Sequence, residues 1–219
     1  MKKYRPFVLG INGSPHSMGI TAKLLDLVLG GAKRAGAETR RVDLYKLRIT
    51  HEPGLYSISS RLEVPKRMPR DDIRDLYKDI IRAGGLVLAT PNYWANMSGI
   101  MKDFIDHLTA LENKNFALEG KVGVFIAASK ENEGGLEMAA TSMAMALAQM
   151  GVLIPPNGIM WHPGDWETIK GKVKNWALHD APICGQKMTE LIKLLKEHPI
   201  LWNEGTTGLL RKRRKRSIN

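Results

Sequence analysis

Apolar residues follow two periodicities along this chain. Short apolar runs bounded by turn residues predict four buried strands, at residues 7–12, 85–90, 122–128 and about 152–160. Residues 38–44 alternate polar and apolar side chains, which is typical of a more exposed outer strand. Apolar residues recur at helical spacing over residues 20–35, 71–83, 99–111, 136–150 and 181–197.

The order of these elements is strand then helix, five times over. Such alternation predicts an α/β domain in which helices cover both faces of a parallel sheet, and we assign this domain to residues 1–200. For five strands the common order is 2-1-3-4-5, a three-layer sandwich whose switch point lies between the first and third strands. Ligands bind at the carboxyl ends of strands beside such a point, so the loops after these two strands are the candidate site.

Two segments do not follow the repeat. Residues 45–70 contain three prolines and three serines, and predict a long irregular excursion from the domain. Residues 201–219 include six consecutive cationic residues at 211–216, without which the formal net charge of +11 would be +5. Like charges repel, so we predict a disordered, solvated tail. Weak binding of this tail to nucleic acid or anionic lipid is the alternative.

The loop after the first strand is suited to an anion. Gly13 and Gly19 let the backbone approach a ligand closely, and Ser14, Ser17 and Thr21 supply hydroxyl groups. A helix follows at once, and its first amide groups carry partial positive charge and have no partner within the helix. These features predict a phosphate site. A tight turn with a serine cap would explain the same residues.

The loop after the third strand is unusual for a surface turn. It begins with Pro91 and places two aromatic residues among amides and a methionine, in the order Pro91, Asn92, Tyr93, Trp94, Ala95, Asn96 and Met97. A flat, half-polar ligand would suit this loop, because aromatic and methionine side chains could cover its face while amides meet its polar edge. Alternatively, Tyr93 and Trp94 fill the core beneath the following helix.

Together these loops resemble those of the NADPH-dependent FMN reductase family, whose fold is flavodoxin-like. The similarity covers most of residues 5–160 and rests on the motifs at 13–21 and 90–106. The resemblance implies that the first loop binds the FMN phosphate, that the second lies along the isoalloxazine ring, and that the turn after the fourth strand also contacts the flavin. The implied cofactor-binding residues are Ser14, His16, Ser17, Gly19, Ile20, Thr21, Pro91, Asn92, Tyr93, Trp94, Asn96, Met97, Ser129 and Gly134.

The chain departs from the family pattern in three ways. The family commonly has Arg and Asn where this chain has His16 and Ile20, so the phosphate would depend more on backbone amides. Iron–sulfur flavoproteins are similar to this family and carry a cysteine cluster after the second strand, whereas the single cysteine here is Cys184. One cysteine excludes an internal disulfide and a cysteine-ligated cluster within one chain. His51, His107 and His162 do not have metal-ligand spacing, so no metal site is predicted.

The resemblance implies an FMN-dependent NAD(P)H oxidoreductase of the flavin or quinone reductase type. NADPH or NADH would transfer a hydride to FMN, and electrons would pass to a second small-molecule acceptor. Because the flavin performs the redox chemistry, no catalytic side chain is assigned. A non-enzymatic flavin electron-transfer protein remains an alternative, as does a nucleic-acid-associated protein acting through its basic tail.

The predicted partners include a second copy of the chain. A homodimer or tetramer follows from the resemblance, and from the helix at 136–150, whose alanines and methionines make it nearly apolar all round. No apolar run reaches the roughly 18 to 20 residues that span a bilayer, and a cytoplasmic location is expected.

Overall fold

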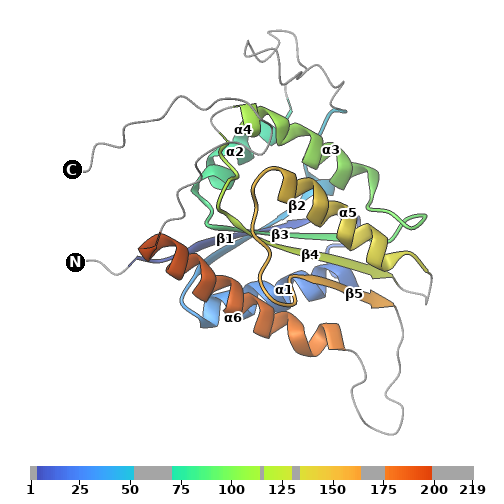
Figure 1. Cartoon of the computed structure of the whole chain (residues 1–219). Coiled ribbons are helices and arrows are strands. Elements are labelled where there is room, and N and C mark those ends of the chain that lie inside the picture. Colours follow the sequence, from blue (N-terminus) through green and yellow to red (C-terminus); the bar gives the residue numbers. More distant parts are fainter. Residues whose placement is uncertain (1–3, 52–70, 114–115, 130–133, 164–175, 199–219) are drawn as a thin grey trace, which may run out of the picture.

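The computed structural model describes residues 4–51, 71–113, 116–129, 134–163 and 176–198. Five parallel strands form one sheet in the order β2-β1-β3-β4-β5 (Figure 1). The strands are β1 Phe7–Asn12, β2 Glu38–Asp43, β3 Gly85–Pro91, β4 Val122–Ser129 and β5 Ile159–Pro163. The helices are α1 Ile20–Arg34, the 3-10 turn η1 Leu44–Lys46, α2 Ile73–Arg82, α3 Gly99–His107, α4 Thr109–Asn113, α5 Leu136–Gln149 and α6 Trp176–Glu197. The predicted α/β class and strand order are confirmed.

Helices cover both faces of this sheet. The helices α1 and α6 lie on one face, and α2, α3, α4 and α5 lie on the other (Figure 1). Their buried side chains form the core on each face. β3 and β4 are buried along almost their whole length as a result. Burial on both faces explains why their sequences are continuously apolar. In the edge strand β2 only Val42 is buried.

Glycines bring α1 and α6 into close contact. A Cβ added to Gly31 would overlap the carbonyl of Pro182, and one added to Gly185 would overlap the carbonyl of Val28. The two helices therefore pack backbone against backbone. This contact holds α1 in place on the sheet, and with it the loop that leads from β1 into α1.

The fifth strand does not lie where the sequence predicts it. β5 is Ile159–Pro163, not residues 152–160. The upstream apolar residues make only an isolated bridge, between Leu153 and Val122. Pro155 and Pro156 cannot donate ladder hydrogen bonds, and Asn157 has a positive φ of 62°, so the chain turns here before β5 begins.

The helix boundaries also differ from prediction in places. α6 begins at Trp176 instead of residue 181 and contains Pro182 in its interior. The helix predicted at 99–111 is divided at Leu108 into α3 and α4. Within the described ranges, no helix has the length and apolar character needed to cross a bilayer. Most of the excursion predicted at 45–70, and the tail at 201–219, lie outside the described residues.

Candidate cofactor site

The first predicted loop joins the carboxyl end of β1 to the start of α1. Gly19 caps α1 in an extended conformation, and among the described residues no side-chain hydrogen bond caps this end of the helix. The first helical bond runs from the Lys23 amide to the Gly19 carbonyl, at 2.9 Å. The amides of Ile20, Thr21 and Ala22 have no acceptor among the described residues. Three unpaired amides at the positive end of a helix are the arrangement that binds a phosphate group.

A buried asparagine shapes this loop from below. Asn12 is fully buried at the end of β1. Its Oδ1 accepts a hydrogen bond from the Ser14 amide at 3.1 Å, and its Nδ2 donates to Asp43 Oδ1 at 2.9 Å. Ser14 Oγ in turn accepts from the His16 amide at 3.2 Å. Hydrogen bonds to Asn12 of β1, which is itself bonded to Asp43 of β2, thus hold the loop before any ligand binds.

The second predicted loop is a tight hairpin after β3. Tyr93 and Asn96 exchange two backbone hydrogen bonds, of 2.9 and 3.1 Å. Between them, Trp94 and Ala95 have φ angles of 53° and 59°. These left-handed angles define a type I′ turn and cost residues other than glycine and asparagine roughly 1–2 kcal/mol each. Backbone strain of this kind is concentrated at functional sites.

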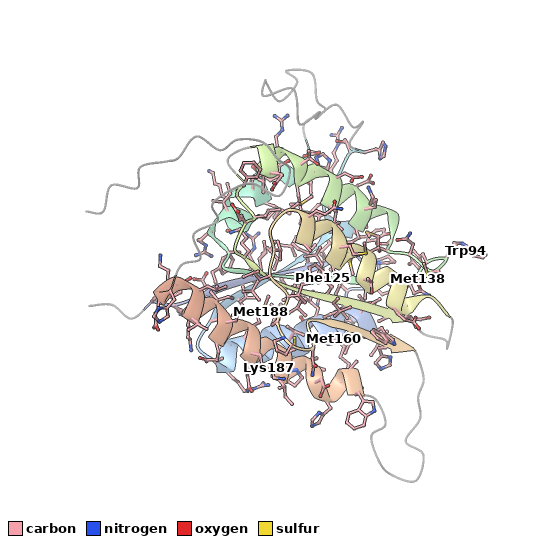
Figure 2. All side chains as sticks on the ribbon, in the orientation of Figure 1. Trp94, Phe125, Met138, Met160, Lys187 and Met188 are labelled. Atoms are coloured by element: carbon pink, nitrogen blue, oxygen red, sulfur yellow. The ribbon has the colours of Figure 1, made fainter. Side chains whose placement is uncertain are left out.

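The aromatic residues of this turn face solvent. Trp94 is 100% exposed and projects away from the domain (Figure 2), while Tyr93 is 43% exposed. The alternative in which these two rings fill the core beneath α3 is therefore wrong. Met97 behaves differently, because it is partly buried against the core on the α3 face of the sheet.

The third loop, after β4, interlocks with the second. Asn92 Nδ2 donates to the Gly134 carbonyl at 3.2 Å, and a Cβ on Gly135 would overlap Ala95. Asn92 is only 6% exposed, yet its Oδ1 has no hydrogen-bond partner within the described part of the chain. A buried acceptor without a donor is costly. An N–H group of a bound ligand would satisfy it.

One serine connects the first loop to the second. Ser98 Oγ donates to the Gly13 carbonyl at 2.8 Å, and the Ser98 amide donates to Thr90 Oγ1 at 2.9 Å. The Gly13 amide donates to the carbonyl of Ala89, in β3, at 2.8 Å. Because β1 and β3 are adjacent strands, these bonds make the two loops a single unit at the switch point of the sheet.

The predicted residues gather at the carboxyl edge of the sheet. The segment from the end of β1 to the first turn of α1 contains Ser14, His16, Ser17, Gly19, Ile20 and Thr21. The end of β3 and the loop after it contain Pro91, Asn92, Tyr93, Trp94, Asn96 and Met97. Ser129 ends β4, and Gly134 precedes α5. Residues 130–133 lie outside the described ranges. Sequence reasoning missed four residues that support the loops, Asn12, Asp43, Thr90 and Ser98. Three of them, Asn12, Asp43 and Thr90, are polar residues at or next to the end of a strand, a signal that would have found them.

Comparison with known proteins shows the family of this chain. The profile of the NADPH-dependent FMN reductases matches residues 6–167. The chain belongs to this family. An iron–sulfur flavoprotein of Methanocaldococcus jannaschii is 31% identical over 136 residues, which are 60% of this chain and 66% of that relative. An iron–sulfur flavoprotein of Methanosarcina thermophila is 26% identical over 196 residues, which are 87% of this chain and 97% of that relative.

Solved structures share the fold. RosB, crystallised with 8-demethyl-8-formylriboflavin 5′-phosphate, has a TM-score of 0.70 and 19% identity, covering 89% of this chain and 82% of RosB. A flavodoxin from the domain Archaea has a TM-score of 0.55 and 13% identity, covering 85% of this chain and 99% of the flavodoxin. At these identities the likeness concerns the fold alone, and the flavodoxin-like prediction is confirmed.

As a member of the FMN reductase family, the chain is an FMN-dependent oxidoreductase. Its loops fit the cofactor, since one offers unpaired amides to a phosphate and the others offer a buried, unpartnered acceptor to a ring N–H. Cys184 lies elsewhere, in α6, where its Sγ donates to the Asn157 carbonyl at 3.4 Å. Burial raises the pKa of the Cys184 thiol to about 12, so it remains protonated and unreactive at neutral pH.

Proposed function

We propose that this protein transfers a hydride from NADPH or NADH to bound FMN and passes the electrons to a second small-molecule acceptor. One observation carries the proposal. Three loops meet at the switch point of a flavodoxin-like sheet, and they present unpaired amides on one side and an unpartnered buried carbonyl oxygen on the other. Membership of the NADPH-dependent FMN reductase family supports the choice of reductant.

In this proposal the FMN phosphate binds at residues 14–22, and the flavin ring lies along residues 91–97 with Ser129 and Gly134 at its edge. FMN, when bound, supplies the redox chemistry. The chain's own residues bind and orient it: the α1 amides compensate the phosphate charge, and Asn92 Oδ1 accepts a ring N–H. The exposed Tyr93 and Trp94 provide aromatic surface for the nicotinamide substrate or the acceptor.

The chain contains a single cysteine, Cys184. The chain has no second thiol with which to ligate an iron–sulfur cluster, although the M. jannaschii and M. thermophila relatives are iron–sulfur flavoproteins. In this proposal electrons pass directly from the flavin to a diffusible acceptor such as a quinone, free FMN or a nitroaromatic compound.

The experiment is to purify the full chain, identify its bound flavin, and follow NADPH and NADH oxidation with each class of acceptor. We expect FMN to be bound and oxidation to depend on the acceptor. A protein that binds FMN but scarcely oxidises either nucleotide would instead be the electron carrier of the alternative hypothesis. A colourless protein that takes up no added FMN would contradict the proposal.

We also propose that the protein is a cytoplasmic homodimer in which α5 contributes to the contact. Most apolar residues of α5 pack on the sheet. Met138, labelled in Figure 2, and Met145 are instead 65% and 62% exposed. Exposed methionines two turns apart on one helix face are suited to a partner surface. Sedimentation at micromolar concentration should give twice the chain mass of 24.4 kDa, and Met145→Glu should shift the protein to a monomer. A wild-type monomer would contradict this part of the proposal.

A further inference from the structure

Arg41 reaches from the edge strand β2 to the first loop. Its Nη2 donates to the Ser17 carbonyl at 2.5 Å, and its Nη1 binds Asp26 of α1 at 2.8 Å. Its Nε donates to Asp43 Oδ1, also at 2.8 Å. The side chain is 21% exposed, although an arginine on an outer strand would be expected to extend into solvent. Arg41 therefore ties three separate segments together.

These bonds close a circuit around the loop. In order, the circuit consists of Arg41, Asp43, Asn12, Ser14, His16 and Ser17. Burial acts to raise the pKa of Asp43, but hydrogen bonds from Lys46, Asn12 and Arg41 outweigh it and hold that pKa below its usual value. The carboxylate thus stays ionised at neutral pH and can accept from both Asn12 and Arg41.

The bond to Ser17 orients the next peptide amide. The Ser17–Met18 peptide is trans, so its C=O and N–H groups point in opposite directions. Since Arg41 binds the carbonyl, the Met18 N–H points away from Arg41. This amide has no acceptor within the described residues, like the amides of the first turn of α1.

We propose that Arg41 is a positioning residue for the FMN phosphate. By holding the Ser17 carbonyl, it presents the Met18 amide to the phosphate and adds this donor to the three amides of α1. The inference rests on the proposed binding of FMN at this loop.

The contribution of Arg41 is geometric. Its positive charge is balanced by ion pairs with Asp26 and Asp43, so little of it remains to attract a phosphate. The planar guanidinium donates at once to three acceptors, on Ser17, Asp26 and Asp43. A lysine ammonium is instead a compact point charge on a flexible stem. Replacement of Arg41 by lysine should therefore not preserve the loop.

The test compares FMN with riboflavin, which has the same ring system and no phosphate. The dissociation constant of each flavin is measured by fluorescence titration of the full chain as wild type, Arg41→Met, Arg41→Lys and Arg40→Met. Arg40 is the matched control, because it is the next residue on β2 and pairs with Asp79, away from the loop. We expect both Arg41 variants to bind FMN about 10- to 100-fold more weakly. Riboflavin affinity should stay within about threefold, and Arg40→Met should match wild type.

Each contrary outcome identifies what has failed. A wild-type protein that does not prefer FMN over riboflavin would contradict the phosphate position itself. If wild type prefers FMN over riboflavin and Arg41→Met retains this preference, the proposed role of Arg41 would be overturned, while the phosphate position would stand. If Arg41→Lys kept the preference, charge and not geometry would be responsible. Equal weakening of both flavins would mean general structural damage, and if Arg41→Met does not fold, Arg41→Lys provides the same comparison.

Discussion

Gly135 joins the second and third loops, and its replacement by alanine should damage both stability and cofactor binding. Gly135 precedes α5 with a φ of +89°, in the left-handed region. An added Cβ would lie 2.6 Å from Ala95 Cα and overlap Ala95 Cβ. Ala95 belongs to the strained type I′ turn, so it cannot move without carrying Trp94 with it.

The expected cost has two parts. Placing alanine in a left-handed conformation costs roughly 1–2 kcal/mol. Relieving the overlap with Ala95 requires backbone movement, and overpacking of this kind costs about 1–3 kcal/mol. Gly135→Ala should therefore lower the free energy of unfolding by about 2–5 kcal/mol. It should also weaken FMN binding at least about tenfold, because the displaced turn lies along the proposed ring site.

The assay is urea unfolding of the flavin-free protein together with FMN titration. Gly134→Ala is the matched control for the unfolding measurement, since a Cβ there meets no described atom within 4 Å. Adding Ala95→Gly to Gly135→Ala removes the overlapping Cβ and the strain at residue 95, so it should restore part of the lost stability as a measurable coupling. If Gly135→Ala lowered the free energy of unfolding no more than Gly134→Ala does, the proposed contact between these loops would be refuted.

Three further predictions concern the rest of the chain. Gly31→Ala should lower the free energy of unfolding by about 2–4 kcal/mol, because the added Cβ overlaps the backbone of α6. Gly30→Ala should be neutral or stabilising by up to about 1 kcal/mol. Equal midpoints of the two variants in thermal melts would mean that α1 and α6 are not in backbone contact. Burial lowers the pKa of the Lys121 amine from 10.5 to about 8, so between these pH values the unfolded chain binds more protons than the folded one. The difference in unfolding free energy between wild type and Lys121→Met should therefore increase by at most about 1.4 kcal/mol per pH unit as the pH rises through this window, and should be constant below it. Urea titrations at several pH values measure this difference. A difference that decreased with rising pH would be inconsistent with a lowered pKa of Lys121. Deleting residues 210–219 should leave FMN binding and NAD(P)H oxidation unchanged. If the intact chain bound DNA in a salt-sensitive way and the deletion abolished this binding, the result would instead support the nucleic-acid alternative.

Much of the architecture follows from local pattern. A continuous apolar run such as β3 must be buried on both faces, and the alternation of such runs with amphipathic helices leaves a doubly wound parallel sheet as the main solution. The difference at β5 has an equally local origin, because Pro155 and Pro156 interrupt the apolar run before β5 begins at Ile159. Prolines lack the N–H that a strand needs, so the two prolines themselves signal where this run stops being a strand.

The sequence by itself also determined which loops form the candidate site, because parallel strands bring the loops after β1, β3 and β4 to one edge whatever their side chains are. Only the tertiary structure decided how those loops are held. The bond from Ser98 to Gly13 joins residues 85 positions apart, and Arg41 meets Ser17 across 24. Contacts of this range depend on strand register and helix placement together, which no local periodicity encodes. For the same reason the outward direction of Trp94 became clear only once the strained turn at residues 93–96 was in place.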